Sequence, residues 1–345
     1  MKKVYSYLMI AASLLLSTAC SDEWTDEQYD QFISIKAPVN SQGNTPIHIR
    51  YKENGKVTYQ LPVIVSGSTM SEKDYDVRVS VDLDTLNQMN VARFSEREEL
   101  YYLPLDEQRY SFPETVHISS GECVGLLNID FDFSKKNGAE LDLAEKWILP
   151  LTIADDPSSS YQPNMRKHYR KALLRIMPFN DFSGSYSTTS MKVYRYDDAE
   201  NKTVGDPMVD NNRTAYVVNE NAVFFYAGLM DEELVKRSIY KIKATFVPDP
   251  DDAEKMSGTV DLEAFDSRID LKIPENATIT YTRSVVKDAI LPYIEHHFVT
   301  IRLEYLFSDI TSVASTPIRY KVVGTMLLER KINTQIPSEE QAIEW

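Results

Sequence analysis

The 345-residue sequence has little glycine, little cysteine and few long apolar runs. Eleven glycines in this length exclude collagen-like and glycine-rich low-complexity chains. Two cysteines, Cys20 and Cys123, exclude a structural zinc site built on paired cysteines. Beyond the first twenty residues, no stretch approaches the ~18 consecutive apolar residues of a transmembrane helix.

Positive charge is also scarce. The chain has 37 lysines and arginines against 52 aspartates and glutamates, a net charge of −15. Nucleic-acid binding requires a basic stripe or patch, and none is present, which excludes nucleic acid as a partner. A neutral ligand such as a glycan remains compatible with this charge. The hydrophobic fraction of 43% is that of a folded globular protein.

Residues 1–19 have the pattern of a secretory signal peptide. Lys2 and Lys3 form a positive start, residues 7–16 form a short apolar run, and small residues follow at 17–19. The apolar run is shorter than the ~20 residues that a membrane span needs.

Cys20 follows this segment directly. Residues 16–20 resemble a bacterial lipobox, although one position departs from the preferred leucine, and in that motif the cysteine is lipidated. Several acyl chains on one residue anchor a protein stably. The next residues, Ser21, Asp22 and Glu23, resemble the signal that exports Bacteroidetes lipoproteins to the outer face of the outer membrane. The alternatives are ordinary signal cleavage and a solvated acidic linker.

Most of the remaining sequence is typical of β-strands. Polar and apolar residues alternate along residues 77–83, which predicts a strand with one buried face. Residues 147–153 predict another strand, and Pro150 within it indicates an edge strand or a bulge. Only residues 231–237, with acids first and bases last, and residues 285–295 favour a helix.

The sequence therefore predicts an all-β fold with four segments. Residues 1–19 are the signal peptide, and residues 20–30 are the lipidated cysteine and an acidic tether. Residues 31–177 are predicted to form an immunoglobulin-like antiparallel β-sandwich. Residues 178–345 contain eight or nine strands in hairpin order, which predicts a calycin- or lipocalin-like β-barrel or a second sandwich.

Several short motifs resemble a known family. They lie at residues 59–63, 77–83, 102–104, 116–121 and 147–151. This succession is similar to the Bacteroidetes domain of unknown function that precedes the catalytic barrel in some family-18 endoglycosidases. The same domain occurs in non-catalytic surface lipoproteins of polysaccharide-utilisation loci, and residues 324–345 resemble the C-terminal domain paired with it there. The resemblance implies a glycan-holding role beside a starch-utilisation-type transporter, and it supplies no transferable binding residues.

Known catalytic patterns are absent from the sequence. A family-18 catalytic barrel takes about 250 residues, more than residues 178–345 supply, and the run Asp-x-x-Asp-x-Asp-x-Glu does not occur. No Gly-x-Ser-x-Gly nucleophile motif occurs either. His296 and His297 stand at the start of a predicted strand, where adjacent residues point to opposite faces, so we expect them not to share a metal. We therefore expect no enzyme activity, no cofactor and no metal.

A glycan site needs an exposed aromatic plane beside polar groups. Tyr194 and Tyr196 share one face of a predicted strand, with Arg195 between them and a polar loop after them. These three residues are the first candidates for glycan binding. The tyrosines of residues 101–110 and the aromatic run 224–226 are the alternatives.

Three functions remain open. The first is a non-catalytic, glycan-binding lipoprotein on the outer membrane, facing the cell exterior, that captures oligo- or polysaccharide for an outer-membrane uptake complex. The second is a structural lipoprotein that joins a surface complex through edge strands or Trp345. The third is a cryptic glycoside hydrolase, which would need two carboxylates about 5–10 Å apart in a cleft.

Overall fold

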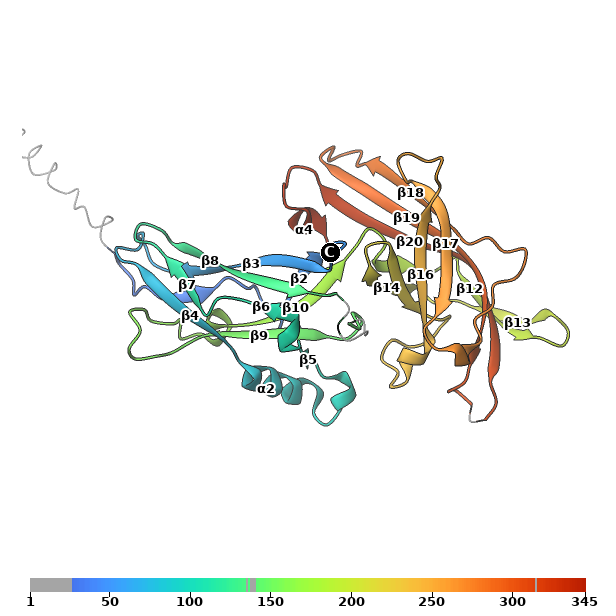
Figure 1. The fold of residues 1–345 in the computed structure, drawn as a ribbon, viewed down its shortest axis with the longest axis horizontal. Helices are drawn as coiled ribbons and strands as arrows, with labels where there is room; N and C mark the ends of the chain where they lie inside the picture. The colour runs from blue at the N-terminus through green and yellow to red at the C-terminus, as the bar shows by residue number, and fades with distance from the viewer. Residues whose placement is uncertain (1–26, 135, 137–140, 314) are drawn as a thin grey trace, which may run out of the picture.

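The computed structural model describes residues 27–134, 136, 141–313 and 315–345. They form an all-β protein with a sandwich at one end and a barrel at the other (Figure 1). The predictions for Cys20, Ser21, Asp22 and Glu23 lie outside the described residues. Within the described ranges, no helix is long and apolar enough to span a membrane.

The sandwich consists of two sheets. The first contains, in order, β1 (Ile33–Ile35), β3 (Lys56–Val65), β8 (Val124–Asp132) and β6 (Tyr110–Ser111). The second contains β2 (Thr45–Arg50), β10 (Lys171–Phe179), β9 (Trp147–Ile153), β4 (Tyr75–Val81) and β7 (Thr115–Ile118), with β5 (Leu103–Pro104) also pairing β9. Alternate residues of each strand face the space between the sheets, where Leu61 and Ile129 are fully buried.

Two of the pairings differ from the expected antiparallel arrangement. Strand β10 runs parallel to β2, with Ile176 opposite Ile47, and β5 runs parallel to β9. Strand β10 continues to Phe179, and the first strand of the barrel begins at Gly184.

The prediction that Pro150 marks an edge strand or a bulge is wrong. Strand β9 lies inside the second sheet, between β10 and β4. The carbonyl of Pro150 accepts a hydrogen bond from the amide of Asp82, where β4 ends, and Ile148 on the same side pairs with β5. On this side, the partner of β9 changes from β5 to β4 at Pro150. The N–H that proline lacks is therefore not needed for a hydrogen bond between strands.

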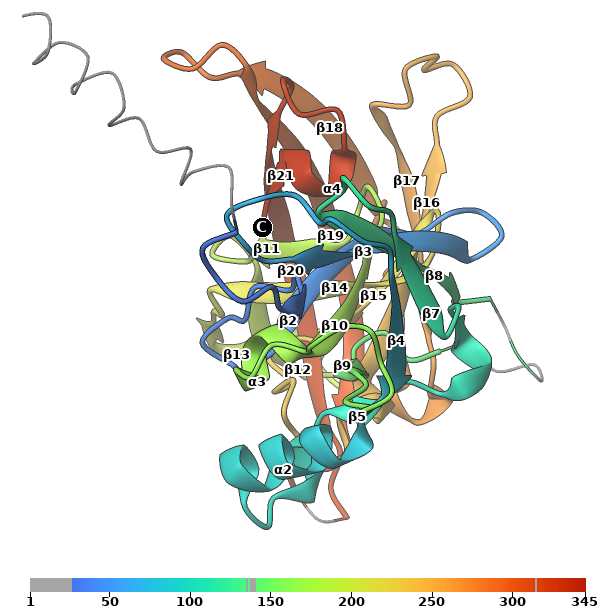
Figure 2. The same cartoon turned by 90° about the vertical axis from the view of Figure 1, so that its left-hand side faces the viewer.

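A helix, α2 (Leu83–Phe94), begins where the sequence predicted the end of a strand. The alternation stops at Val81, and the carboxylate of Asp82 caps the helix by accepting from the amide of Thr85 at 3.1 Å. Only Thr85, Leu86 and Asn90 of this helix are buried, so the sequence carries no apolar stripe that would reveal it. Figure 2 shows α2 below β5 and β9, and Leu86 of the helix packs with Ile148 and Leu173 on the outer face of the second sheet.

The barrel is a closed ring of eight strands, as the sequence predicted in outline. In order these are β11 (Gly184–Ser187), β14 (Asn212–Asn219), β15 (Ala222–Tyr226), β16 (Lys241–Pro248), β17 (Ser257–Ala264), β18 (Thr280–Lys287), β19 (Ile294–Asp309) and β20 (Ile318–Asn333). Pairing of Ser187 with Leu327 closes the ring. Strands β12 (Lys192–Asp197) and β13 (Lys202–Met208) extend from β20 as a hairpin outside it (Figure 1).

Both predicted helices of the second half are absent. Residues 285–287 complete β18, and a loop containing Pro292 joins it to β19. Residues 231–236 form turns, followed by the short 3₁₀ helix η3 (Arg237–Tyr240). A helix of seven residues is too short to be stable when only favourable charges at its two ends support it.

The C-terminal segment joins the two halves. Its short helix α4 (Glu339–Ala342) lies beside β2, where Glu339 pairs with Arg50, and β21 (Ile343–Glu344) adds to β20. The final residue, Trp345, stacks on His48 of the sandwich with the ring centres 3.9 Å apart. Trp345 is therefore docked mainly on the sandwich, and it remains 52% exposed.

Candidate ligand-binding groove

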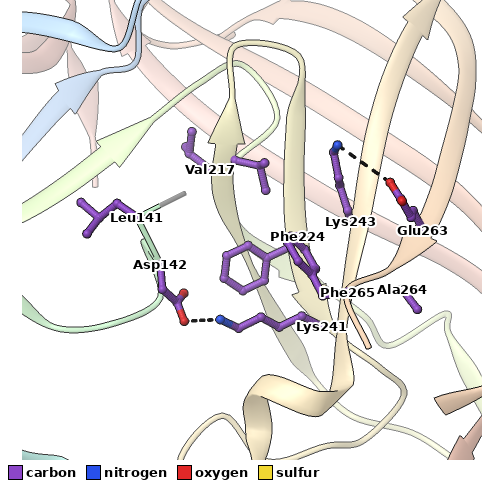
Figure 3. A pocket seen from close by; sticks show the side chains of 10 residues that line it. Leu141, Asp142, Val217, Phe224, Lys241, Lys243, Glu263, Ala264 and Phe265 are labelled. Atoms are coloured by element: carbon purple, nitrogen blue, oxygen red, sulfur yellow. Dashed lines mark hydrogen bonds and ion pairs between the residues drawn. The ribbon is translucent and has the colours of Figure 1, made fainter. Parts of the chain in front are cut away.

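A groove lies on the outer face of barrel strands β14 to β17, where a loop of the sandwich reaches across to the barrel (Figure 3). Its volume is about 480 Å³, within the ~300–1,000 Å³ of small-molecule sites. Large side chains such as Tyr186, Tyr305 and Phe307, each at most 1% exposed, occupy the barrel interior.

The strand registers determine which side chains line the groove. Residues directly opposite each other in antiparallel strands share one face. The first row across the four strands is Tyr216, Phe224, Lys243 and Glu263. The next row contains Tyr226 and Lys241, with Phe265 bonded through its amide to the Lys241 carbonyl. Aromatic rings and charged groups therefore share this surface.

The aromatic rings form one cluster. Phe224 packs against Tyr216 with ring centres 5.4 Å apart and meets Phe265 edge to face at 5.9 Å. Phe224 is 3% exposed and Phe265 is 49% exposed. The groove therefore presents one half-exposed aromatic ring, Phe265, which rests on the buried ring of Phe224. It does not present two exposed aromatic rings.

The sandwich contributes the opposite wall through residues 141–147. Asp142 forms an ion pair with Lys241 of the barrel, drawn in Figure 3. Glu145 accepts two hydrogen bonds from Arg237, at 2.8 and 2.9 Å. Trp147 fixes the same loop from the sandwich side, because its indole N–H donates to the Asp142 carbonyl at 2.7 Å. These contacts hold the wall in one position relative to the barrel.

Electrostatics keep the phenols beside the groove neutral. Burial, together with the nearby carboxylate of Glu232, raises the pKa of Tyr216 well above its ordinary value, and its hydroxyl donates to Glu232 at 2.6 Å. Burial also raises the pKa of Tyr226. For Arg237, burial opposes the charged form, but Glu145 and Tyr226 together outweigh it and raise the pKa.

The groove combines an apolar face with paired charges. Lys241 lies 4.7 Å from the centre of the Phe224 ring, and Lys243 lies 4.0 Å from Glu263. The two lysines balance Asp142 and Glu263, so the surface has donors and acceptors but no excess charge. A pyranose has apolar C–H faces and a rim of hydroxyls, which suits a ring such as Phe265 beside Lys243 and Glu263.

The three residues that the sequence favoured for glycan binding lie away from the groove. Tyr194, Arg195 and Tyr196 lie on β12, in the hairpin that extends outside the barrel. The Tyr196 hydroxyl donates to Asn201 and so closes that hairpin, and Arg195 is exposed. None of these residues lines the groove.

The other candidates have local partners. Tyr102 is 3% exposed, and its backbone amide and carbonyl bond to the Asn90 side chain. His296 contacts Glu329 at 2.7 Å and Asp288 at 3.1 Å, through its two ring nitrogens. In the part of the chain that the structure describes, no group of three histidine, cysteine or acidic side chains is arranged to hold a metal.

Sequence reasoning identified only part of the groove. The run 224–226 was among the alternatives, and its alternation places Phe224 and Tyr226 on one face. Phe265 directly follows the end of a strand, and no sequence motif marks it as a binding residue. Asp142 is 99 positions from Lys241 in the sequence, so only folding reveals their contact.

Comparison with known proteins shows which family the chain resembles. A family model described as a domain of unknown function, DUF4973, matches residues 24–157, and a second, described only as a C-terminal domain, matches residues 170–327. A Bacteroides ovatus protein of unknown function is 46% identical, with 91% of this chain and 100% of that chain covered and a TM-score of 0.80. The chain belongs to this family of two-part Bacteroides proteins.

Two further solved structures support this membership. A Bacteroides ovatus multidomain protein including DUF1735 is 45% identical, with 91% of this chain and 100% of that chain covered and a TM-score of 0.78. An auxiliary nutrient binding protein from Bacteroides thetaiotaomicron is 36% identical, with 89% of this chain and 97% of that chain covered and a TM-score of 0.76. No curated protein matches the chain.

Proposed function

We propose that this family member is a non-catalytic glycan-binding protein and that the groove beside Phe265 holds the glycan. The observation that carries the proposal is the half-exposed Phe265 ring on its aromatic support, flanked by Lys243 and Glu263. The relative named as an auxiliary nutrient binding protein supports a binding role. The balanced charges of the groove favour a neutral sugar.

The carboxylates of the groove support binding rather than hydrolysis. Glycoside hydrolysis requires one carboxyl group to donate a proton and a second one to act as a base or nucleophile. Asp142 is instead held by the ammonium group of Lys241, and Glu263 is 77% exposed at the rim. This arrangement suits hydrogen bonding to sugar hydroxyls.

The test is calorimetric titration of residues 21–345 against neutral plant, host and microbial polysaccharides. We expect one glycan class to bind without release of reducing ends. Phe265→Ala should weaken that binding about tenfold or more, because stacking on the ring is lost, and a tenfold change corresponds to about 1.4 kcal/mol.

Two variants control this experiment. Tyr169→Ala removes another exposed aromatic side chain, 41% exposed, from a site outside the groove, and it should leave binding unchanged. Tyr194→Ala separates the two candidate platforms. If Tyr194→Ala loses glycan binding and Phe265→Ala retains it, the site lies on the hairpin. If no polysaccharide of the panel binds, the proposal of glycan binding is rejected.

We also propose that the protein is anchored to the outer membrane through lipidated Cys20. Ser21, Asp22 and Glu23 would direct it to the cell exterior, where it would pass oligosaccharide to an uptake complex. The lipobox-like sequence and the acidic residues after it support this arrangement. Cys20→Ser should move the protein from the membrane fraction to the soluble fraction, and retention in the membrane would contradict the anchor.

A further inference from the structure

The end of the barrel that faces the sandwich contains a second pocket, of about 190 Å³. Its walls continue the inward-facing rows of the barrel core. Arg283 pairs with Val299, which pairs with Leu328, and the next row is Val285, His297 and Arg330. The core is therefore apolar inside, and its last layer at this mouth becomes cationic.

Three arginines from different elements line this pocket. Arg50 comes from β2 of the sandwich, Arg283 from β18 and Arg330 from β20. Arg50 is saturated by acids, since it contacts Asp181 at 2.9 Å and binds both carboxylate oxygens of Glu339. Arg283 shares the same Asp181, at 3.3 Å.

Arg330 is the cation without an acid. It is 9% exposed, and its Nη2 donates to the carbonyls of Asn180 at 3.0 Å and Ser183 at 2.8 Å. Among the described residues, no carboxylate lies within 4.0 Å of its guanidinium nitrogens. Burial, with Arg50 nearby, lowers the pKa of Arg330, and Asp181 and Glu339 offset only part of this effect.

The acids of the pocket are already committed. Burial alone would raise the pKa of Asp181, but Arg50, Arg283 and the more distant Arg330 together outweigh it and hold the pKa below its ordinary value. His297 contacts Glu295 at 3.2 Å. Three guanidinium groups thus face two carboxylates, Asp181 and Glu339, and one positive charge remains available for a ligand.

We propose that this barrel-mouth pocket binds the carboxylate of an acidic sugar unit such as a uronic acid, with Arg330 and Arg283 as its ligands. A guanidinium binds a carboxylate through two parallel hydrogen bonds, which gives both strength and orientation. Val285, Leu328 and Ile332 supply apolar wall for the C–H face of the ring. The volume equals that of about six waters at ~30 Å³ each, which is room for one sugar ring.

This site is separate from the groove beside Phe265 and does not rest on it. The two share no lining residue, and they differ in charge: the groove is balanced, whereas the pocket has one cation in excess. The pocket would recognise a charged unit or end of a glycan.

The test is calorimetric titration of residues 21–345 with sodium D-glucuronate, D-glucose and inorganic phosphate. Glucose is the neutral counterpart of glucuronate, and phosphate is an anion without a ring. We expect glucuronate to bind, glucose not to bind, and phosphate to bind at least tenfold more weakly. Binding should weaken as ionic strength rises.

Arg283→Gln is the informative variant, because Arg283 is 28% exposed and Asp181 keeps Arg50 as its partner. Arg302→Gln, on an exposed position of β19, is the matched control. We expect Arg283→Gln to bind glucuronate at least tenfold more weakly than the unmodified protein. Arg302→Gln should bind it as tightly as the unmodified protein. If Arg283→Gln does not fold, the Nε–H NMR signal of Arg330 in the unmodified protein gives the second readout and should shift on adding glucuronate.

Four outcomes would overturn the proposal, three of them in the unmodified protein. These three are equal binding of glucose and glucuronate, equal binding of phosphate and glucuronate, and absence of binding at millimolar glucuronate. Unchanged binding in Arg283→Gln would place the ligand elsewhere. Failure here leaves the groove untouched, because the Phe265→Ala experiment uses neutral glycans.

Discussion

The sandwich and the barrel fill their interiors with different side chains. The sandwich core is mostly isoleucine, valine and leucine, whereas the barrel core contains Tyr186, Tyr240, Tyr281, Tyr305 and several phenylalanines. Two sheets pack about 10 Å apart, a gap that branched aliphatic side chains fill by interdigitation. An eight-stranded barrel has a wider centre that side chains can just fill, and rings do so here.

This difference has a consequence for function. Rings carry hydroxyl groups into the barrel core, where the hydroxyls of Tyr240 and Tyr305 have partners and that of Tyr281 has none among the described residues. The Tyr240 hydroxyl donates to Asp309 at 2.8 Å, and the Tyr305 hydroxyl accepts from the Gly228 amide at 3.1 Å. With the centre of the barrel occupied, the candidate ligand sites lie on its outer wall and at its mouth.

The largest expected effect tests the packing contrast directly. Phe225→Ala removes a ring that is 1% exposed in the barrel and should lower the free energy of unfolding by about 3–5 kcal/mol. Ile129→Val removes one methylene from the sandwich core and should lower it by about 1 kcal/mol. Urea unfolding of both variants measures the difference. Equal losses would mean that the barrel collapses into the cavity.

The second prediction concerns the junction between the two halves. Burial, with Arg175 and Arg330 nearby, lowers the pKa of His48 to about 4 in the folded protein, against ~6.5 when unfolded. The unfolded chain therefore takes up the proton first, and stability is lost as pH falls from about 6.5 through 4. The loss amounts to at most about 3 kcal/mol.

His48→Phe tests this pH dependence, because it keeps a ring against Trp345 and removes the titration. The difference in free energy of unfolding between variant and unmodified protein should shift in favour of the variant between pH 7 and pH 4.5. Urea unfolding at the two pH values measures it, and other titrating groups cancel in the difference. An identical pH dependence in both proteins would show that His48 does not titrate at this junction.

The smallest expected effect concerns the hairpin outside the barrel. Tyr194 contributes to neither core, so Tyr194→Ala should change the free energy of unfolding by no more than about 0.5 kcal/mol. Thermal melting compares the variant with the unmodified protein. A loss of 2 kcal/mol or more, on the order of a core substitution, would instead place Tyr194 in the packing of the barrel, as Val193 of the same strand is.

Local sequence patterns predicted the strands well. They failed to predict the helix α2 and the position of Pro150 within its sheet. Alternation along residues 77–83 identified β4, because one face of that strand is buried and the other is solvated. It extended wrongly into α2, where the Asp82 cap and the contacts of Asn90 decide the conformation. The edge strand inferred from Pro150 failed because the position of a proline within a sheet depends on which strands pair beside it.

The sequence by itself determined the all-β class and limited the second half to a barrel or a second sandwich. These follow from composition and from period-two alternation, which are local properties of the chain. Tertiary structure alone decided both candidate sites. Asp142 meets Lys241, and Arg50 meets Asp181 and Glu339, only because the two halves are docked. Contacts between residues far apart in sequence leave no local pattern that a reader of one sequence could detect.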